Sequence, residues 1–205
     1  MRRLVNHKRP QSTQPKIKVC TPQSSHGWLE YKLNQTELDY VWSCVNDKRN
    51  SWSHNLAGNI EGSYKLEDRN DWFFNNTLTS LVNSYENTFE SLGDKDVLDQ
   101  WWVNYQKQYD FNPSHNHDGV YSFVIWLKIP YEWEDQNKDN ESKAQMKGSF
   151  CFSYINMLGE HERAIYQLGK QHEGTMLLFP SALHHEVFPF YNCEEDRISV
   201  SGNIT

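Results

Sequence analysis

The sequence predicts a mainly β protein with flanking helices, in which an antiparallel jelly roll follows an N-terminal helical part. Two stretches before Gly93 space apolar residues three and four apart, as amphipathic helices do. After Gly93, runs rich in Val, Ile, Phe, Tyr and Trp recur about every ten to twenty residues and have the composition of short strands. Several strands without intervening helices favour a sandwich or barrel over a parallel sheet.

The length of 205 residues suffices for one domain with a sizeable core. We expect residues 1–30 to form an extended N-terminal segment, 31–95 a helical support and 96–205 the jelly-roll core. A net charge of −7 argues against a general nucleic-acid binder, which needs a basic surface. No apolar block is long enough for a signal peptide or a membrane span, so we expect a cytoplasmic protein. The four cysteines have irregular spacings typical of reduced thiols: Cys20, Cys44, Cys151 and Cys193.

The first helix is predicted over residues 34–48, with Thr36 as its N-cap. The second is predicted over residues 70–92 and is expected to end at Gly93. Gly, Asn and Ser residues between the two helices indicate a connecting loop with room for one short strand.

Seven strands are predicted in the second half of the chain. A polar stretch at 131–148 interrupts them as a long loop, and loops of that length are usually functional or disordered. The predicted strands cover residues 100–105, 121–129, 149–156, 164–168, 175–179, 184–188 and 196–204.

Histidines cluster beside two of these strands. His115 and His117 in "NPSHNHDGVY" are two positions apart, so in an extended segment both imidazoles point the same way and can bind one metal ion. By the same alternation Asp118 points away. A third histidine follows in "FPSALHHEVFP", where His184 or His185 must face inward, and the pattern of apolar neighbours does not decide which.

The last predicted strand carries a polar row opposite an apolar one. Arg197, Ser199, Ser201 and Asn203 share one face. A hairpin about "FYNCEED" would bring His185 and Arg197 together on neighbouring antiparallel strands. Because a guanidinium matches a carboxylate, the constellation indicates a ligand that chelates a metal at one end and carries a carboxylate at the other.

The order "HNH", "GTMLLFPSALHHEVFP" and "RISVSGNI" resembles the 2-oxoglutarate and iron(II) dependent oxygenases, in particular a subgroup found in bacteria and in tailed phages of marine cyanobacteria. The resemblance covers roughly residues 101–204, with a weaker match at "NLAGNIEGSY". It implies a double-stranded β-helix fold, Fe(II) as cofactor and 2-oxoglutarate and dioxygen as cosubstrates. The implied reaction is hydroxylation of an unidentified protein side chain or small molecule, with decarboxylation of 2-oxoglutarate to succinate.

The resemblance also implies roles for individual residues. In the subgroup the FP-turn is followed by HxVxP, and matching this motif selects His185 as the metal ligand. Arg197 looks like the residue that binds the distal carboxylate of 2-oxoglutarate, with Ser199 assisting. Tyr105 or Tyr109 is similar in place to a tyrosine that contacts the cosubstrate in relatives.

The sequence departs from the family pattern at one ligand, because the family usually has HxD…H and position 117 is His. Three interpretations follow: a three-His site formed by His115, His117 and His185, a shifted site that uses Asp118, or a lapsed site. We favour the first, since Asp118 should face away, although a bulge at Gly119 would turn it inward.

Two alternatives belong to other classes. A cupin-type three-His dioxygenase needs no 2-oxoglutarate, but cupins place a Glu about four residues after the second His, where this chain has Val120, Tyr121 and Ser122. In such a dioxygenase Arg197 would also have no functional role. The second alternative is a non-catalytic jelly-roll module, for binding or structure, in which the histidines lie on the surface without a function.

Under the favoured interpretation, Phe123, Trp126 and Phe179 keep the cavity dry. The 131–148 loop and the basic N-terminus are candidates for covering its mouth. The substrate and the oligomeric state stay open. We expect the protein in a cytoplasm, that of a host cell if a phage encodes it, without membrane or nucleic-acid partners.

Overall fold

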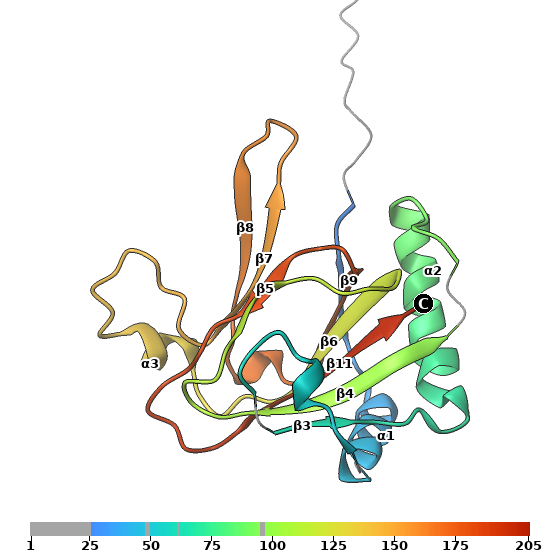
Figure 1. Cartoon of the computed structure of the whole chain (residues 1–205), viewed down its shortest axis with the longest axis horizontal. Coiled ribbons are helices and arrows are strands. Elements are labelled where there is room, and N and C mark those ends of the chain that lie inside the picture. The colour runs from blue at the N-terminus through green and yellow to red at the C-terminus, as the bar shows by residue number, and fades with distance from the viewer. Residues whose placement is uncertain (1–25, 48–49, 61, 95–96) are drawn as a thin grey trace, which may run out of the picture.

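The computed structural model describes residues 26–47, 50–60, 62–94 and 97–205. Within these residues the chain forms eleven strands. Figure 1 shows strands in the body of the molecule and helices at its periphery. The strands are β1 (Leu29–Lys32), β2 (Asn50–Ser51), β3 (Gly62–Lys65), β4 (Leu98–Gln106), β5 (Asn112–His115), β6 (Tyr121–Lys128), β7 (Ser149–Ile155), β8 (His161–Gln167), β9 (Thr175–Pro180), β10 (His185–Val187) and β11 (Arg197–Ile204). The main helices are α1 (Gln35–Asn46), α2 (Thr79–Thr88) and α3 (Trp133–Asn137).

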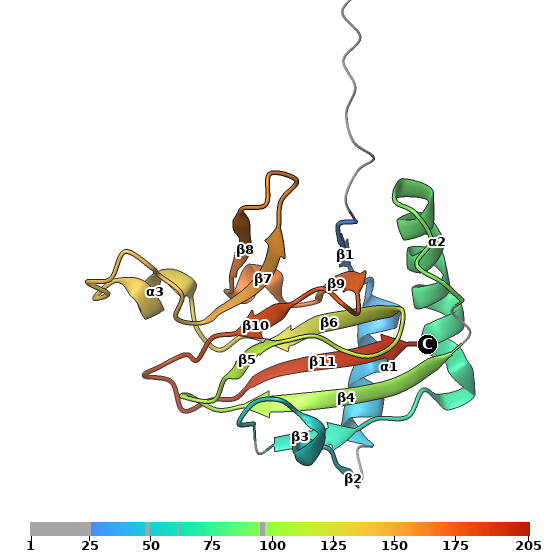
Figure 2. The ribbon, with the colours of Figure 1, turned by 45° about the horizontal axis from the view of Figure 1, so that its top comes forward.

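The strands form two antiparallel sheets, as expected for a double-stranded β-helix. The larger sheet has the order β1-β9-β6-β11-β4-β3-β2, and the smaller one has the order β5-β10-β7-β8. In Figure 2, β5 and β10 lie across the large sheet, while the β7–β8 hairpin projects away from the body. The predicted fold class is confirmed.

Two apolar clusters hold the layers together. One joins the large sheet to α1 and α2, with Val41, Val82 and Tyr85 packed against strand residues such as Val103. The other fills the space between the sheets and includes Phe152. Because β4 and β11 bury residues on both faces, their second face is available to the space between the sheets, where the candidate site lies.

The first helix forms where predicted, but Thr36 is not its N-cap. The side chain of Asn34 accepts a hydrogen bond from the backbone N–H of Glu37 (3.1 Å), and the Glu37 carboxylate accepts one from the N–H of Asn34 (2.8 Å). This reciprocal pair is a capping box, which satisfies two backbone donors at once. Asn34 therefore begins the helix two residues earlier than the sequence reading placed it.

The second predicted helix is shorter and less regular than 70–92. A turn of 3-10 helix at Arg69–Asp71 precedes it, and a π-helical segment at Phe74–Leu78 leads into α2. The Asp68 carboxylate accepts hydrogen bonds from the backbone N–H groups of Phe73 and Phe74, both at 2.9 Å. The helix ends at Phe89, not at Gly93, where the Phe89 ring packs on Tyr85 with the centroids 4.8 Å apart.

All seven predicted strands are present, with bounds that differ by a few residues. Sequence reading did not assign β1 or β5 as strands, and it missed α3 inside the 131–148 loop. The loop predicted between the helices does contain a short strand, β3.

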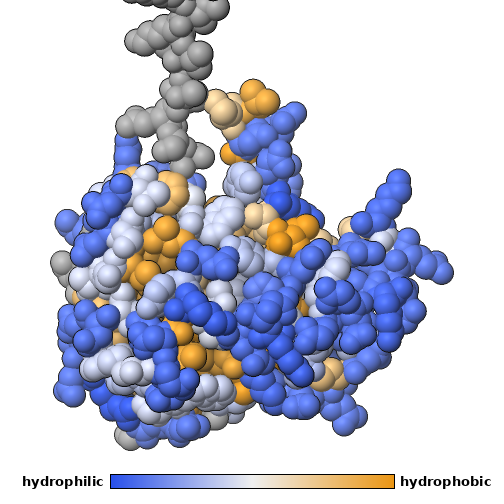
Figure 3. Space-filling view, turned by 180° about the vertical axis from the view of Figure 1, so that it is seen from behind, coloured by the Kyte–Doolittle hydropathy of each residue, from blue (hydrophilic) through white to orange (hydrophobic). Residues whose placement is uncertain are grey.

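Among the described residues Cys44, Cys151 and Cys193 are free thiols, as predicted, while Cys20 lies outside the described part. Within that part no helix is both long and apolar enough to cross a bilayer. The face seen in Figure 3 is largely hydrophilic with small, separate hydrophobic patches.

Candidate functional site

Three histidine side chains meet between the sheets. His115 is the last residue of β5, His117 follows two residues later, and His185 opens β10. His115 and His185 are direct cross-strand partners, and the ring centroids of His117 and His185 are 5.0 Å apart. One ring nitrogen from each histidine lies within 4.8 Å of the others.

Backbone carbonyls fix the orientation of two of these rings. The Nδ1 atom of His115 lies 2.7 Å from the carbonyl oxygen of Pro113, and that of His185 lies 3.0 Å from the carbonyl oxygen of Leu183. A carbonyl only accepts, so both Nδ1 atoms must carry the proton and both Nε2 atoms keep a free lone pair. The Nε2 atoms of His117 and His185 are 3.2 Å apart, so these two ring nitrogens converge.

The local environment keeps the imidazoles uncharged. Burial lowers the pKa of His115 and of His185, and it lowers the pKa of His117 to about 4. Neighbouring imidazoles add to the effect because like charges disfavour each other. Neutral imidazoles are the form that binds transition metals.

The neighbouring candidates do not join this cluster. His184 is exposed and faces a separate surface groove beside Leu183. Asp118 is also exposed, and it is not among the converging metal-ligating groups of the described residues. Gly119 does adopt a left-handed conformation (φ 98°), but this turn leaves the carboxylate outside the cluster.

A cavity runs between the two sheets from the three imidazoles to Arg197. The aromatic residues predicted to keep it dry, Phe123, Trp126 and Phe179, all line it. Polar residues of the large sheet complete the lining: Asn104, Gln106, Arg197, Ser199 and Ser201.

Arg197 is almost completely buried, at 1% exposure, and its contacts in the described structure involve neutral groups. Its guanidinium donates to the hydroxyl of Tyr131 and to the side-chain oxygen of Gln106, both at 2.5 Å. Longer contacts reach the carbonyl oxygens of Phe188 (3.3 Å) and Gly148 (3.5 Å). These partners satisfy donors but leave the positive charge uncompensated, an expensive arrangement that an anionic ligand would relieve.

Tyr131 stays a neutral partner. Its hydroxyl donates to the carbonyl of Gly148 at 2.9 Å and accepts from Arg197. Burial raises the pKa of Tyr131, so the phenol remains protonated and does not neutralise the guanidinium.

The route by which His185 and Arg197 come together differs from the predicted hairpin. β10 pairs with β5 and β7 in the small sheet, whereas β11 pairs with β4 and β6 in the large sheet. The two residues therefore face each other across the cavity, and the prediction of neighbouring strands was wrong. The segment between β10 and β11 is a crossover and not a hairpin loop. Its residue Phe190 is fully buried between the sheets, where the segment passes from the small sheet to the large one.

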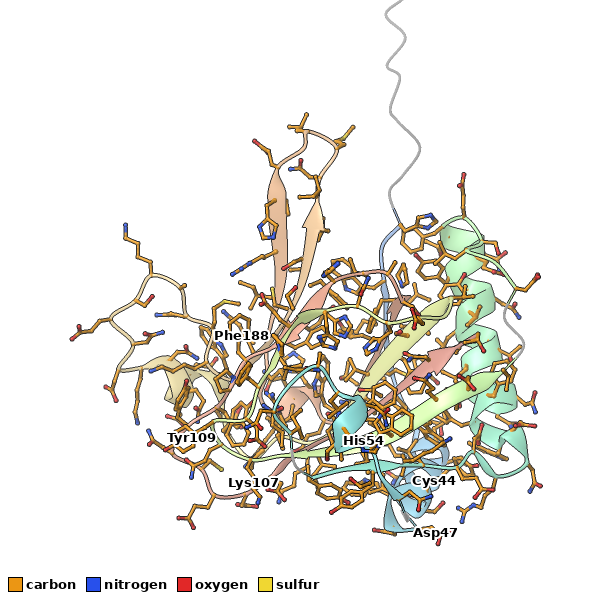
Figure 4. The ribbon with its side chains drawn as sticks, in the orientation of Figure 1. Cys44, Asp47, His54, Lys107, Tyr109 and Phe188 are labelled. Atoms are coloured by element: carbon orange, nitrogen blue, oxygen red, sulfur yellow. The ribbon has the colours of Figure 1, made fainter. Side chains whose placement is uncertain are left out.

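The structure does not bring the two candidate tyrosines into the cavity. Tyr105 lies on the opposite face of β4. There it packs on Tyr64 and on the apolar cluster that joins the large sheet to α1 and α2, which we call the helix-side cluster. Tyr109 is 61% exposed and packs edge-on against Tyr191, and Figure 4 shows it near Lys107 on the turn beyond β4.

Sequence reading missed two polar residues of the cavity and one hydrogen-bond partner of Arg197. Asn104 and Gln106 interrupt the apolar strand "WWVNYQ" on the same face as Trp102, and this alternation was a usable signal. Tyr131 carried no such signal, because its place beside Arg197 depends on the fold of the loop that follows β6.

Comparison with known protein families identifies a match over half of the chain. Residues 100–203, about half of the chain, match the family model described as "Putative 2OG-Fe(II) oxygenase". Among curated proteins none matches the sequence.

Solved structures with a similar fold include a 2OG-Fe(II) oxygenase family oxidoreductase from Burkholderia pseudomallei (13% identity, 87% of this chain and 84% of that one, TM-score 0.53). A prolyl-4-hydroxylase from Pseudomonas putida is 14% identical over 88% of this chain and 92% of that one, with a TM-score of 0.51. A Trichoplax adhaerens prolyl hydroxylase, solved with a hypoxia inducible factor peptide, is 16% identical over 88% of this chain and 84% of that one, also with a TM-score of 0.51.

At these identities the structural neighbours establish the double-stranded β-helix fold, and the family model carries the assignment further. Proteins of this family are oxidoreductases that use Fe(II) and 2-oxoglutarate. The chain belongs to the 2OG-Fe(II) oxygenase family.

Proposed function

We propose that this protein is a hydroxylase in which His115, His117 and His185 hold Fe(II) and Arg197 binds the distal carboxylate of 2-oxoglutarate. One observation carries the proposal: a single cavity has three converging imidazoles at one end and a buried, uncompensated guanidinium at the other. We propose residues 96–205 as the catalytic core of a single domain whose preceding segments 1–30 and 31–95 support it.

The donor set fits a divalent transition metal. Nitrogen ligands from imidazole suit iron, and two of the rings are already oriented through Nδ1 by Pro113 and Leu183. Ligands that are oriented and unprotonated before the metal arrives need little rearrangement to bind it.

The spacing of the two ends suits a five-carbon dicarboxylate. Phe188, three residues after His185, is the residue whose carbonyl oxygen accepts from the Arg197 guanidinium. Three residues of extended chain span roughly 10 Å, enough for a metal ion and a short dicarboxylate between them. Ser199, on the same strand and two residues nearer the centre, supplies a hydroxyl donor toward the middle of the ligand.

A neutral ligand set is compatible with an anionic cosubstrate. Where relatives have Asp, His117 adds no negative charge, so the metal keeps its full charge and attracts a dianion more strongly. Tyr105 and Tyr109 take no part in the site that we propose, because neither lines the cavity.

When bound, Fe(II) supplies the oxidative chemistry that converts 2-oxoglutarate to succinate and CO₂ and consumes dioxygen. The protein's own residues bind, orient and exclude water. Trp126, Phe150 and Phe179 are each buried to at least 98% and form an apolar lining beside the imidazoles. A dry lining protects a reactive site from water and strengthens its electrostatic contacts.

The substrate is a side chain or a small molecule. We also propose that the reaction takes place in a cytoplasm, that of a bacterial host if the gene is a phage's, because the motifs resemble the subgroup found there.

The test is succinate release from labelled 2-oxoglutarate by purified protein, with Fe(II) and oxygen. We expect turnover that stops without iron and falls to background in His185→Ala, while His184→Ala, the adjacent exposed histidine, retains it. Succinate release that survives in His185→Ala, or its absence from iron-loaded wild type, would remove the proposal.

A further inference from the structure

A second cleft opens directly onto the three imidazoles. It shares Trp102, Asn112, His115 and His117 with the cavity described above. Its outer wall comes from the segment between β2 and β3, which the Asn59–Phe111 β-bridge ties to the start of β5. The remaining lining residues are Trp52, Asn55, Leu56, Ala57, Gln100 and Asn116.

The lining of this cleft is polar without being charged. Four of its residues are carboxamides, namely Asn55, Gln100, Asn112 and Asn116, and among the described lining residues none is Lys, Arg, Asp or Glu. A buried charge needs a partner, so this lining disfavours a charged group and suits a neutral one that both donates and accepts hydrogen bonds.

Two residues that line the cleft each carry a buried polar atom without a hydrogen-bond partner among the described residues. Trp102 is 3% exposed, and its indole N–H is an unsatisfied donor. The side-chain oxygen of Asn112 is an unsatisfied acceptor. A buried unpaired donor and acceptor are each costly, so together they mark a place for a ligand.

Asn112 also links the cleft to the metal site. Its amide nitrogen lies 3.1 Å from Nε2 of His115, the atom that a metal would take. A metal ion bound at this atom would replace the contact with Asn112.

We propose that this cleft binds the substrate through an uncharged amide of the peptide type, and this inference rests on the function proposed above. The indole N–H of Trp102 donates to the amide carbonyl, and the side-chain oxygen of Asn112 accepts from the amide N–H. A peptide amide supplies this complement of one acceptor and one donor without charge. The amide then sits beside the three imidazoles, with the carbon to be oxidised next to it.

The test uses protein loaded with Zn(II) and 2-oxoglutarate, which holds the site without turnover. The ligands are N-methylacetamide, which has a single amide, its ester analogue methyl acetate, which lacks the N–H, and acetate, which is charged. The readout is the ¹⁵N–¹H signal of the Trp102 indole, assigned by its loss in Trp102→Phe.

Trp101 provides a matched internal control. It is also 3% exposed with an unpartnered indole N–H, but it packs in the helix-side cluster away from the cleft. We expect N-methylacetamide to shift the Trp102 signal saturably and to leave Trp101 unmoved. One lost hydrogen bond corresponds to about fivefold in affinity, so binding of the ester, of acetate and by the Asn112→Ala variant should each be about fivefold weaker.

The possible outcomes separate this inference from the function on which it rests. An unmoved Trp102 signal, or equal binding of all three ligands, in protein that binds Zn(II) and 2-oxoglutarate overturns the substrate class and leaves the oxygenase proposal standing. Failure to bind Zn(II) and 2-oxoglutarate, measured separately by calorimetry, overturns the metal site instead. The ligand series on wild-type protein decides the question even if Trp102→Phe does not fold.

Discussion

Replacing the buried arginine tests the cosubstrate end of the site. In Arg197→Met the side chain keeps much of its length and apolar contact but loses its charge and its donors. The short bonds to Tyr131 and Gln106 are made without a ligand, whereas the contacts to Phe188 and Gly148 are long at 3.3 and 3.5 Å. We expect the incoming carboxylate to replace these two long contacts with charge-assisted hydrogen bonds.

A hydrogen bond to a charged group contributes about 1.5–3 kcal/mol, and part of the gain offsets the contacts that are displaced. A net contribution of about 3 kcal/mol corresponds to a loss of affinity on the order of 100-fold. Four neutral partners each lose a donor, worth about 0.5–1.5 kcal/mol, and removal of the uncompensated buried charge offsets part of this loss, so stability should fall by about 2–4 kcal/mol.

The assay is calorimetric titration of 2-oxoglutarate into Mn(II)- or Fe(II)-loaded protein under anaerobic conditions, together with metal content and thermal unfolding. Arg163→Met is the matched control, because Arg163 lies on β8 with a half-exposed side chain that pairs with Glu186 at 3.8 Å. An Arg197→Met protein that is folded, retains its metal and binds 2-oxoglutarate with unchanged affinity would refute the role of Arg197.

Three further predictions follow from the same structure. His185→Ala should lose nearly all bound iron whereas His184→Ala keeps it, as measured by metal analysis after anaerobic desalting; equal loss in both would place the wrong histidine in the site. Tyr131→Phe should weaken 2-oxoglutarate binding about fivefold at unchanged metal content, because Arg197 loses one acceptor that orients it, worth about 1 kcal/mol. Unchanged affinity would show that Tyr131 does not orient Arg197 for the cosubstrate. Gly202→Ala should lower the free energy of unfolding by about 1–3 kcal/mol in denaturant titrations, because the new Cβ would lie 2.6 Å from the Phe123 ring; a fully stable variant would contradict the packing of β11 on β6.

The strands could be predicted because their composition and alternation record which face is buried. On β11, Ile198 and Val200 pack toward the helices while Arg197 and Ser199 line the cavity, as the polar and apolar rows indicate. β5 escaped detection because it is a polar edge strand that contains Pro113, and proline is tolerated there.

The pairing of distant strands could not be predicted from local pattern. The nine residues between β10 and β11 have the length of a hairpin loop or of a crossover, and only the burial of Phe190 between the sheets distinguishes the two. The contact between Tyr131 and Arg197 could not be predicted for the same reason, because the contacts of a loop residue depend on the whole fold. The three histidines could be predicted from the sequence because their spacing and their positions next to strands are local features.

The claim that one cavity binds a metal and a dicarboxylate together is tested most directly by the metal dependence of 2-oxoglutarate binding. We predict that the anaerobic affinity for 2-oxoglutarate rises at least about tenfold when Fe(II) is present, which corresponds to about 1.4 kcal/mol of coupling between the two ligands. In His185→Ala this enhancement should disappear while the weak, metal-independent binding through Arg197 persists. Equal affinity for 2-oxoglutarate with and without Fe(II) in the wild-type protein would contradict a shared site.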